Sequence, residues 1–316
     1  MAGSQLLPLV SVVVAVRNEQ AGIVDCLESL LRMDYPSERR ELLIVDNGST
    51  DRTAEVVRRY PVAYLHESCR GVCHARNRGI QNATGEILAL TDPDCVVSTG
   101  WLRELMQPFG DPGVGMVGGE IIPFPGRTPA ESYAARRRSH SQQRPMSHPR
   151  RPFAMTPNVA VRREVFRQIG LFDVRFPGGG WEDADLSWRC VRESNFRLAY
   201  APRAVVFHRY RTTARDFFVQ QQRYGYGLAL LRRKYSGELE RSWHEILLAY
   251  RDLVRTAGAL AAVAARRDRL NHASQDTALF DLLRQLGQTV GSVRGTLAFV
   301  RKGGSGTPHD NPKPPR

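Results

Sequence analysis

Long hydrophobic runs are absent from this chain of 316 residues. The longest unbroken apolar stretches, residues 12–16 and 257–265, are far shorter than the roughly twenty residues that a membrane-spanning helix needs. No basic and apolar leader precedes Leu6, which argues against a secretory signal. We therefore expect neither an integral membrane protein nor a secreted one, and we expect a cytoplasmic location.

Cysteine is also scarce, with five residues and no repeated pairing of the kind that binds zinc. Cys69 and Cys73 are separated by three residues, but no second pair with zinc-like spacing follows them. An odd number of scattered cysteines does not make a disulfide framework, so this usage fits a reducing compartment.

Acidic residues are outnumbered, with 32 Asp and Glu against 45 Lys and Arg, which gives a net charge of +13. Such a charge favours polyanionic partners: nucleotide phosphates, nucleic acid or an anionic membrane surface. The chain has no interleaved basic and aromatic recognition motif, which argues against nucleic acid. With 42% hydrophobic residues it can bury one large core, or one core with an appendage.

Strand and helix patterns alternate through the first part of the chain. The apolar runs predict strands over residues 9–16, 41–45, 62–65 and 86–91, and the helical patterns fall at residues 22–31, 52–60 and 71–82. This order predicts an α/β fold with a parallel sheet that helices cover on both faces. Ligands of such sheets bind where the strands end, and three polar clusters follow predicted strands, at residues 17–19, 46–51 and 92–94.

Two acidic clusters carry the strongest chemical signal. Asp92 and Asp94 flank Pro93 directly after a predicted strand. Two carboxylates at that place suit a hard cation whose coordination shell is completed by the phosphates of a substrate. Glu182 and Asp183 follow three consecutive glycines and open a helical segment, where a carboxylate can act as a general base. Simpler readings remain open: the first cluster also suits an ordinary turn, and the second suits capping of a helix dipole.

Residues 125–152 differ in composition from the rest, with seven arginines and a single acidic residue. This composition is typical of a solvated loop, although such a loop can also close over phosphates. After Arg211 the pattern is helical, with one apolar stripe formed by Trp243, Leu247, Tyr250, Val254 and Ala257. A second stripe is formed by Leu279, Leu283, Leu286, Val290, Val293, Leu297 and Val300. These stripes suit packing on the core, while nearby arginines allow binding to an anionic membrane surface.

Five ordered motifs resemble those of the family 2 glycosyltransferases, which are enzymes of the GT-A fold. The resemblance extends from about residue 10 to residue 226, and its motifs lie at residues 13–19, 43–51, 71–79, 92–94 and 182–183. It implies a mixed, mainly parallel sheet flanked by helices, with a C-terminal helical extension. The expected division is a catalytic domain at residues 1–215, with a nucleotide-sugar half at about 1–95 and an acceptor half at about 96–215. A helical region at 216–302 and a disordered tail at 303–316 follow.

The resemblance also implies roles for individual residues. The implied nucleotide-sugar site comprises Val16, Asn18, Glu19, Asp46, Asn47, Arg76 and Asp92. Asp92 and Asp94 would hold Mn²⁺ or Mg²⁺ against the donor diphosphate, with His208 either as an additional ligand or simply as the last residue of a strand. Asp183 would be the general base of an inverting transfer, and Glu182 would orient the acceptor or the base.

The segment Gln220, Arg223 and Tyr224 resembles the Gln-x-x-Arg-Trp motif of processive polysaccharide synthases, with Tyr in place of Trp. The resemblance implies that these three residues and Trp181 contact the acceptor or the diphosphate oxygens. Asn47 is a second departure, since many relatives carry Asp there.

The expected function is transfer of a sugar from a nucleoside-diphosphate sugar to a hydroxyl of a glycan or lipid-linked acceptor. The pathway would be cell-envelope or exopolysaccharide biosynthesis, in the cytoplasm or on the inner face of the cell membrane. A nucleotidyltransferase is the alternative enzyme class, but residues 10–20 lack the glycine-rich phosphate loop with Lys or Arg that such enzymes usually carry. A basic nucleic-acid-binding protein is the non-enzymatic alternative.

Overall fold

The fold is built on one mixed sheet of eight strands. The computed structural model describes residues 7–137, 139–176, 179–239, 251, 254, 258 and 272–301. In the sheet the strands are ordered β3-β2-β1-β4-β7-β6-β8-β5. The strands are β1 (Val10–Val16), β2 (Arg40–Asp46), β3 (Ala63–His66), β4 (Ile87–Thr91), β5 (Cys95–Val97), β6 (Val114–Pro123), β7 (Val159–Arg162) and β8 (Arg197–His208).

Strand direction divides the sheet into two parts. Strands β3, β2, β1 and β4 are parallel neighbours. Both faces of β1, β2 and β4 are largely buried, which accounts for their continuous apolar runs, whereas β3 is an edge strand with exposed ends. Strand β7 is antiparallel to β4 and to β6, whereas β6 and β8 are parallel. The first four strands match the predicted positions to within about one residue, and the predicted mixed, mainly parallel sheet is confirmed.

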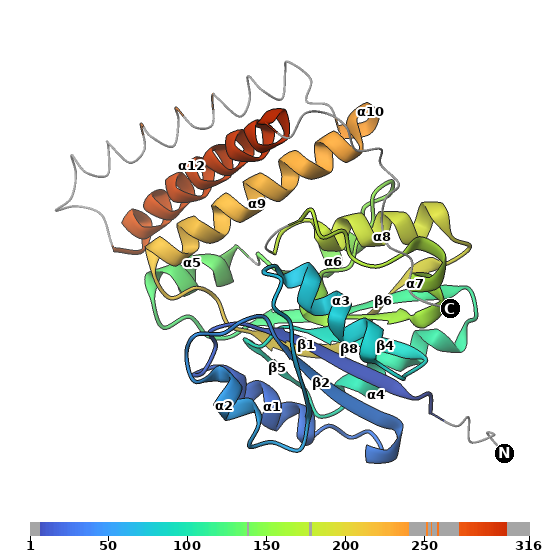
Figure 1. Cartoon of the computed structure of the whole chain (residues 1–316). Helices are drawn as coiled ribbons and strands as arrows, with labels where there is room; N and C mark the ends of the chain where they lie inside the picture. The colour runs from blue at the N-terminus through green and yellow to red at the C-terminus, as the bar shows by residue number, and fades with distance from the viewer. Residues whose placement is uncertain are drawn as a thin grey trace.

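Helices cover both faces of the sheet (Figure 1). One face packs against α1 (Ile23–Leu31), α2 (Thr53–Val57) and α4 (Trp101–Met106), as the first core cluster indicates. The other face packs against α3 (Val72–Asn82), α7 (Arg163–Ile169) and α8 (Glu182–Glu193). Strand β1 serves both cores, because Val12 and Val14 lie in the first cluster while Val13 lies in the second.

The short strand β5 determines where two distant parts of the chain meet. It pairs antiparallel with the end of β8, so Cys95 lies opposite His208. The turn between β4 and β5 contains Asp92 and Asp94, and the backbone amide of Cys95 donates to the Asp92 carbonyl at 3.1 Å. The pairing therefore brings the last residue of β8 beside the first acidic cluster.

The arginine-rich segment is not the loop that its composition indicated. It contains α5 (Pro129–Arg136) and α6 (Gln143–Met146), and Thr128 caps α5 through a capping box with Glu131. Tyr133 of α5 packs against Phe217 and Phe280, with ring centroids 5.5 and 5.4 Å away. The loop expectation was wrong because Ala130 and Tyr133 of α5 belong to this cluster, while Arg136 of the same helix is exposed.

The C-terminal part consists of long helices, α9 (Ala214–Lys234) and α12 (His272–Arg301), with the short α10 (Ser236–Leu239). Helices α9 and α12 lie side by side (Figure 1). Gly291 allows this close approach, because a Cβ there would lie 1.9 Å from the Gln222 carbonyl oxygen. The predicted stripe from Trp243 to Ala257 falls mostly outside the described residues, as does the tail after residue 302.

The second predicted stripe lies on α12, and its members differ in how far they are buried. Leu283 packs against the cluster around Phe280. Four other members are exposed to solvent by 38–55%: Leu279, Leu286, Val293 and Leu297. Across the described segments, no helix combines the length and the apolar character needed to cross a membrane.

Candidate active site

The loops after β1 and β2 are joined by hydrogen bonds where the two strands end. Asn18 has a positive φ of 51°, which its short polar side chain tolerates. Its Oδ1 accepts from the Thr50 amide at 2.8 Å, and its own amide donates to Ser49 Oγ at 3.0 Å. Glu19 donates its amide to Thr53 Oγ1 at 2.8 Å. The first two predicted clusters therefore form one rim of a shared site.

Asp46 and Asn47 are buried, and their side chains form hydrogen bonds with other groups of the protein. Asp46 accepts from the Ser49 amide and from the Tyr64 hydroxyl, both at 2.9 Å. Asn47 Nδ2 donates to the carbonyls of residues 67 and 69, and its Oδ1 accepts from the Gly71 amide at 2.8 Å. The Val16 side chain is buried, and its carbonyl accepts from the Asn47 amide at 2.9 Å. These contacts hold the start of α3 against the end of β2.

Arg76 of α3 joins the two acidic clusters. Its guanidinium is buried and donates to Asp92 Oδ1 at 3.0 Å and to Glu182 Oε1 at 2.7 Å. Burial alone would lower the pKa of Arg76, but the charges of Asp92 and Glu182 outweigh it and raise that pKa. The carboxylates that lie ninety residues apart in sequence are thus held by one permanent cation.

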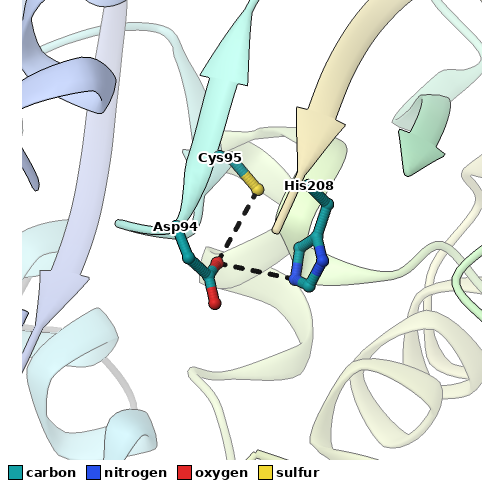
Figure 2. A group of neighbouring side chains, drawn as sticks. All are labelled: Asp94, Cys95 and His208. Carbon is teal, nitrogen blue, oxygen red and sulfur yellow. Dashed lines mark hydrogen bonds and ion pairs between the residues drawn. The ribbon is translucent and has the colours of Figure 1, made fainter. Parts of the chain in front are cut away.

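Asp94 and His208 form the part of the site that suits a cation (Figure 2). His208 Nε2 lies 3.5 Å from Asp94 Oδ1, and possible ligand atoms of Asp94, Cys95 and His208 all lie within 4.8 Å of one another. Burial lowers the pKa of His208 to about 4, so its imidazole is neutral and can donate a lone pair at neutral pH. Burial raises the pKa of the Cys95 thiol well above its usual value, which makes it a poor ligand.

The surrounding charges also favour a cation. Burial raises the pKa of both Asp92 and Asp94. The pKa of Glu19 is also raised, mainly by burial and next by the charge of Asp94. The charge of Asp94 thus disfavours the ionisation of both Asp92 and Glu19, and a divalent ion would stabilise the three carboxylates. The oxygen and nitrogen donors present fit Mn²⁺, and two carboxylates also fit Mg²⁺.

Residues that sequence reasoning did not select complete this region. The His140 ring stacks on the ring of His208, with centroids 4.5 Å apart, and His140 Nε2 lies 3.1 Å from the Tyr224 hydroxyl. Arg211 Nη2 lies 3.7 Å from Asp94 Oδ2. His140 gave no sequence signal, because it stands in the segment that resembled a loop. Arg211 could have been found, since it closely follows the strand that ends at His208.

The second acidic cluster opens α8. Trp181 precedes the helix with a φ of 73°, and its indole Nε1 donates to the Tyr224 carbonyl at 3.0 Å. Glu182 accepts from the Gly180 amide at 2.5 Å in addition to Arg76. Asp185 is fully buried and paired with Arg189 and Lys234, at 2.9 and 2.6 Å. Glu182 and Asp185 are therefore both committed to cations of the protein.

Asp183 differs from its neighbours. Its Oδ1 accepts from the Ala184 amide at 2.8 Å, and within the described residues no Lys, Arg or His is hydrogen-bonded to its carboxylate. Burial and, next, the charge of Glu182 raise the pKa of Asp183 to about 7. A carboxylate with this pKa can take up a proton near neutral pH, as a general base must. It is the carboxylate of this cluster best suited to such a role.

The α9 motif lies along the same region. The Tyr224 side chain contacts His140 and its carbonyl holds Trp181, so this residue connects α9 to both halves of the site. Arg223 is exposed, and burial of part of its side chain and the charges of Arg211 and Arg17 lower its pKa. Gln220 is half-buried on the same helix. The neighbouring Gln221, outside the motif, is buried and accepts from Gln288 of α12 at 3.0 Å.

A mixed α/β sheet with carboxylates gathered where its strands end has the place and the charge of a ligand site at this edge of the sheet. The family model for glycosyl transferase family 2 matches residues 11–170. The chain belongs to this family, and the predicted family and enzyme class, glycosyltransferase, are confirmed.

Two relatives illustrate the similarity in sequence. Glycosyltransferase AglE of Haloferax volcanii is 33% identical over 211 residues, which is 64% of this chain and 67% of AglE. The pre-mycofactocin glycosyltransferase of Mycobacterium tuberculosis is 31% identical over 225 residues, or 68% of this chain and 46% of that protein. This chain therefore spans two thirds of one relative and about half of the other.

Solved structures support the fold. The mannosyltransferase PcManGT from Pyrobaculum calidifontis, solved with GDP-Man and Mn²⁺, superposes with a TM-score of 0.63 at 23% identity. The match covers 93% of this chain and 88% of that one. Residues 1–349 of S. aureus TarS in complex with UDP give 0.50 at 17% identity, covering 93% and 91%. The GT-A fold is confirmed.

Proposed function

We propose that this protein transfers a sugar from a nucleoside-diphosphate sugar to a hydroxyl of a glycan or lipid-linked acceptor, with inversion at the anomeric carbon. One observation carries the proposal most strongly. Arg76 bonds both Asp92 and Glu182, so the cluster suited to a donor diphosphate and the cluster suited to an acceptor hydroxyl form one buried network. A transfer between two bound substrates needs this juxtaposition.

On the donor side, we assign the nucleotide to the rim formed by the loops after β1 and β2, with Val16, Asn18, Glu19, Asp46 and Asn47. Asp46 and Asn47 act there by holding the rim in shape, since their side chains already bond to other protein groups. Asp92, Asp94 and His208 would hold Mn²⁺ or Mg²⁺. A divalent ion at this place supplies positive charge to the departing diphosphate.

On the acceptor side, Asp183 takes the proton from the attacking hydroxyl. The acceptor oxygen forms a bond to the anomeric carbon as the bond from that carbon to the nucleoside diphosphate breaks on the opposite face. The nucleotide leaves with the electron pair, and the proton stays on Asp183. Glu182 is held by Arg76 and Gly180, so its role is to position the start of α8.

Trp181, Gln220, Arg223 and Tyr224 are proposed to contact the acceptor or the diphosphate. The Trp181 indole donates a hydrogen bond to the Tyr224 carbonyl, which connects α9 to the residue that precedes Glu182 and Asp183. A ring at this place can stack on a sugar, and an arginine can bind phosphate oxygens in a bidentate manner. The solved neighbours contain GDP-Man with Mn²⁺ and UDP, which supports a nucleotide-sugar donor but leaves its base open.

The cellular setting is part of the proposal. We assign the enzyme to cell-envelope or exopolysaccharide biosynthesis, acting from the cytoplasm on the inner face of the cell membrane. Support comes from α12, where Val293 and Leu297 are exposed by 53% and 55% beside Arg294. Apolar and basic side chains together favour adsorption to anionic lipid. We retain the division into a catalytic domain at residues 1–215 and a helical region at 216–302.

A thermal-shift screen tests the donor class. UDP-, GDP- and dTDP-sugars are added with and without Mn²⁺, and a donor at about 100 times its dissociation constant stabilises the protein by about 2.7 kcal/mol. We expect one nucleotide to stabilise the protein, and only when the ion is present. No stabilisation by any nucleotide sugar, with DNA stabilising the protein instead, would contradict the proposal.

A further inference from the structure

A cavity that shares only Arg223 with the residues assigned above lies between α9, α12 and the segment before α8. It measures about 260 Å³ and is lined by Gly180, Val219, Gln222, Arg223, Tyr226, Gly227, Gly291 and Arg294. Gln222 and Arg223 each lie three or four residues from Val219 and from Tyr226, so these four side chains share one face of α9. Helix α12 supplies the opposite wall.

The shape of this cavity depends on backbone contacts that only glycine permits. A Cβ on Gly227 would lie 2.1 Å from the Gly180 carbonyl oxygen, and one on Gly291 would lie 1.9 Å from that of Gln222. Both contacts are with backbone atoms, which cannot move aside as a flexible side chain can. The walls are therefore held at a defined separation.

The cavity is positively charged. Its lining contains two arginines and no acidic residue. Within the part of the chain that the structure describes, neither the Arg223 nor the Arg294 guanidinium makes a hydrogen bond or ion pair with a side chain. Arg223 also lies near the charges of Arg211 and Arg17. Unpaired guanidinium groups around a hollow favour a phosphate or diphosphate group.

An apolar surface continues from the charged cavity. Val219 is 37% exposed at its wall, and Tyr226 adds an aromatic ring. On α12, Leu297 lies one turn after Arg294 and is 55% exposed. Apolar side chains open to solvent beside a cationic hollow suit a ligand in which an anionic group is attached to a hydrocarbon chain.

This cavity lies next to Glu182 and Asp183, which connects it to the reaction. Gly180 lines it, and the amide of the same residue donates to Glu182, which adjoins Asp183. We propose that the cavity binds the phosphate of an amphiphilic acceptor, with the receiving sugar directed toward Asp183 and the hydrocarbon chain leaving along α12. This inference rests on the proposed function for its choice of acceptor, but the binding site itself can be tested without any donor.

Calorimetry with monomeric dodecyl phosphate tests the inference, using dodecyl maltoside as a neutral amphiphile and inorganic phosphate as an anion without a chain. We expect saturable binding of one dodecyl phosphate per chain, at least tenfold tighter than either comparison compound. Loss of one charged hydrogen bond should weaken this binding about ten- to a hundredfold in Arg294→Gln. Arg203→Gln is the matched control, because it removes the same charge from a side chain 78% exposed that pairs with Glu104.

Unchanged affinity in Arg294→Gln would overturn the proposal, as would equal affinity for dodecyl maltoside or for inorganic phosphate. Circular dichroism and the melting temperature show whether the variant is folded. Because no sugar donor is used, failure to find a donor would count against the proposed function alone. Normal donor binding together with no dodecyl phosphate binding would count against this site alone.

Discussion

Replacing Arg76 by methionine tests the bridge between the two acidic clusters. Methionine keeps much of the length and the helix propensity of arginine but removes the charge. The substitution leaves Glu182, whose side chain is 3% exposed, without its cation, and it leaves Asp92, at 24%, without one of its donors. The variant should therefore be less stable, and the two clusters should no longer be coupled.

The magnitude follows from burial. Removing one partner of a buried ion pair costs about 3–5 kcal/mol, because an uncompensated charge stays in a poorly hydrated place. At about 2 °C per kcal/mol for a chain of this size, the melting temperature should fall by about 6–10 °C. The lost positive charge also raises the pKa of Asp183 further, since Arg76 is one of the groups that lower it. A smaller fraction of Asp183 is then ionised at neutral pH, so the rate of transfer should also fall.

Differential scanning calorimetry gives the stability, and Arg78→Met is the matched control. Arg78 lies two residues along the same helix and is exposed, so its replacement should change the melting temperature by less than about 2 °C. Adding Glu182→Gln to Arg76→Met should restore part of the stability, because the amide needs no counter-charge. If Arg76→Met melts within 1 °C of the unsubstituted protein, the bridge does not have the energetic role that we assign to it.

Four further predictions concern the base, the helical region and the membrane. Asp183→Asn should keep the fold and donor affinity but reduce transfer by roughly 10² to 10⁴, and near-normal transfer would move the base elsewhere. Because a base must be unprotonated, transfer by the unsubstituted enzyme should fall as pH drops through about 7, and a rate independent of pH between 5 and 8 would contradict this. Lys234 connects α9 to Asp173 and Asp185 at 3.0 and 2.6 Å, so Lys234→Met should lower the stability by about 1.5–3 kcal/mol in chemical denaturation, and an unchanged midpoint would exclude this. Co-sedimentation with anionic vesicles should decrease with salt, whereas equal binding to neutral vesicles would refute an electrostatic contribution.

Local patterns were sufficient for the parallel half of the fold. The apolar run that became β1 is buried on both faces, and such a run predicts a central strand without knowledge of its neighbours. The antiparallel half was harder, because β5 has three residues and its pairing with β8 joins segments more than a hundred residues apart. Short strands of this kind depend on tertiary pairing, which a single sequence does not show.

The candidate site was predictable where the carboxylates themselves gave the signal. Asp92 and Asp94 follow a strand and Asp183 stands in the first turn of a helix, so their place in the sequence indicates their chemistry. The Arg76 bridge was not predictable in this form, since both its partners come from other elements. His140 was missed for a related reason: its contacts with His208 and Tyr224 exist only after the chain has folded.

Metal-dependent donor binding by Asp94→Ala tests the central claim most directly. The donor found in the thermal-shift screen is titrated into the unsubstituted protein and into this variant, with and without Mn²⁺, and binding is measured by calorimetry. We expect Mn²⁺ to increase the affinity of the unsubstituted protein, and we expect the variant to lose both that increase and all turnover. Equal affinities with and without Mn²⁺ in both proteins, with turnover retained in the variant, would contradict the account.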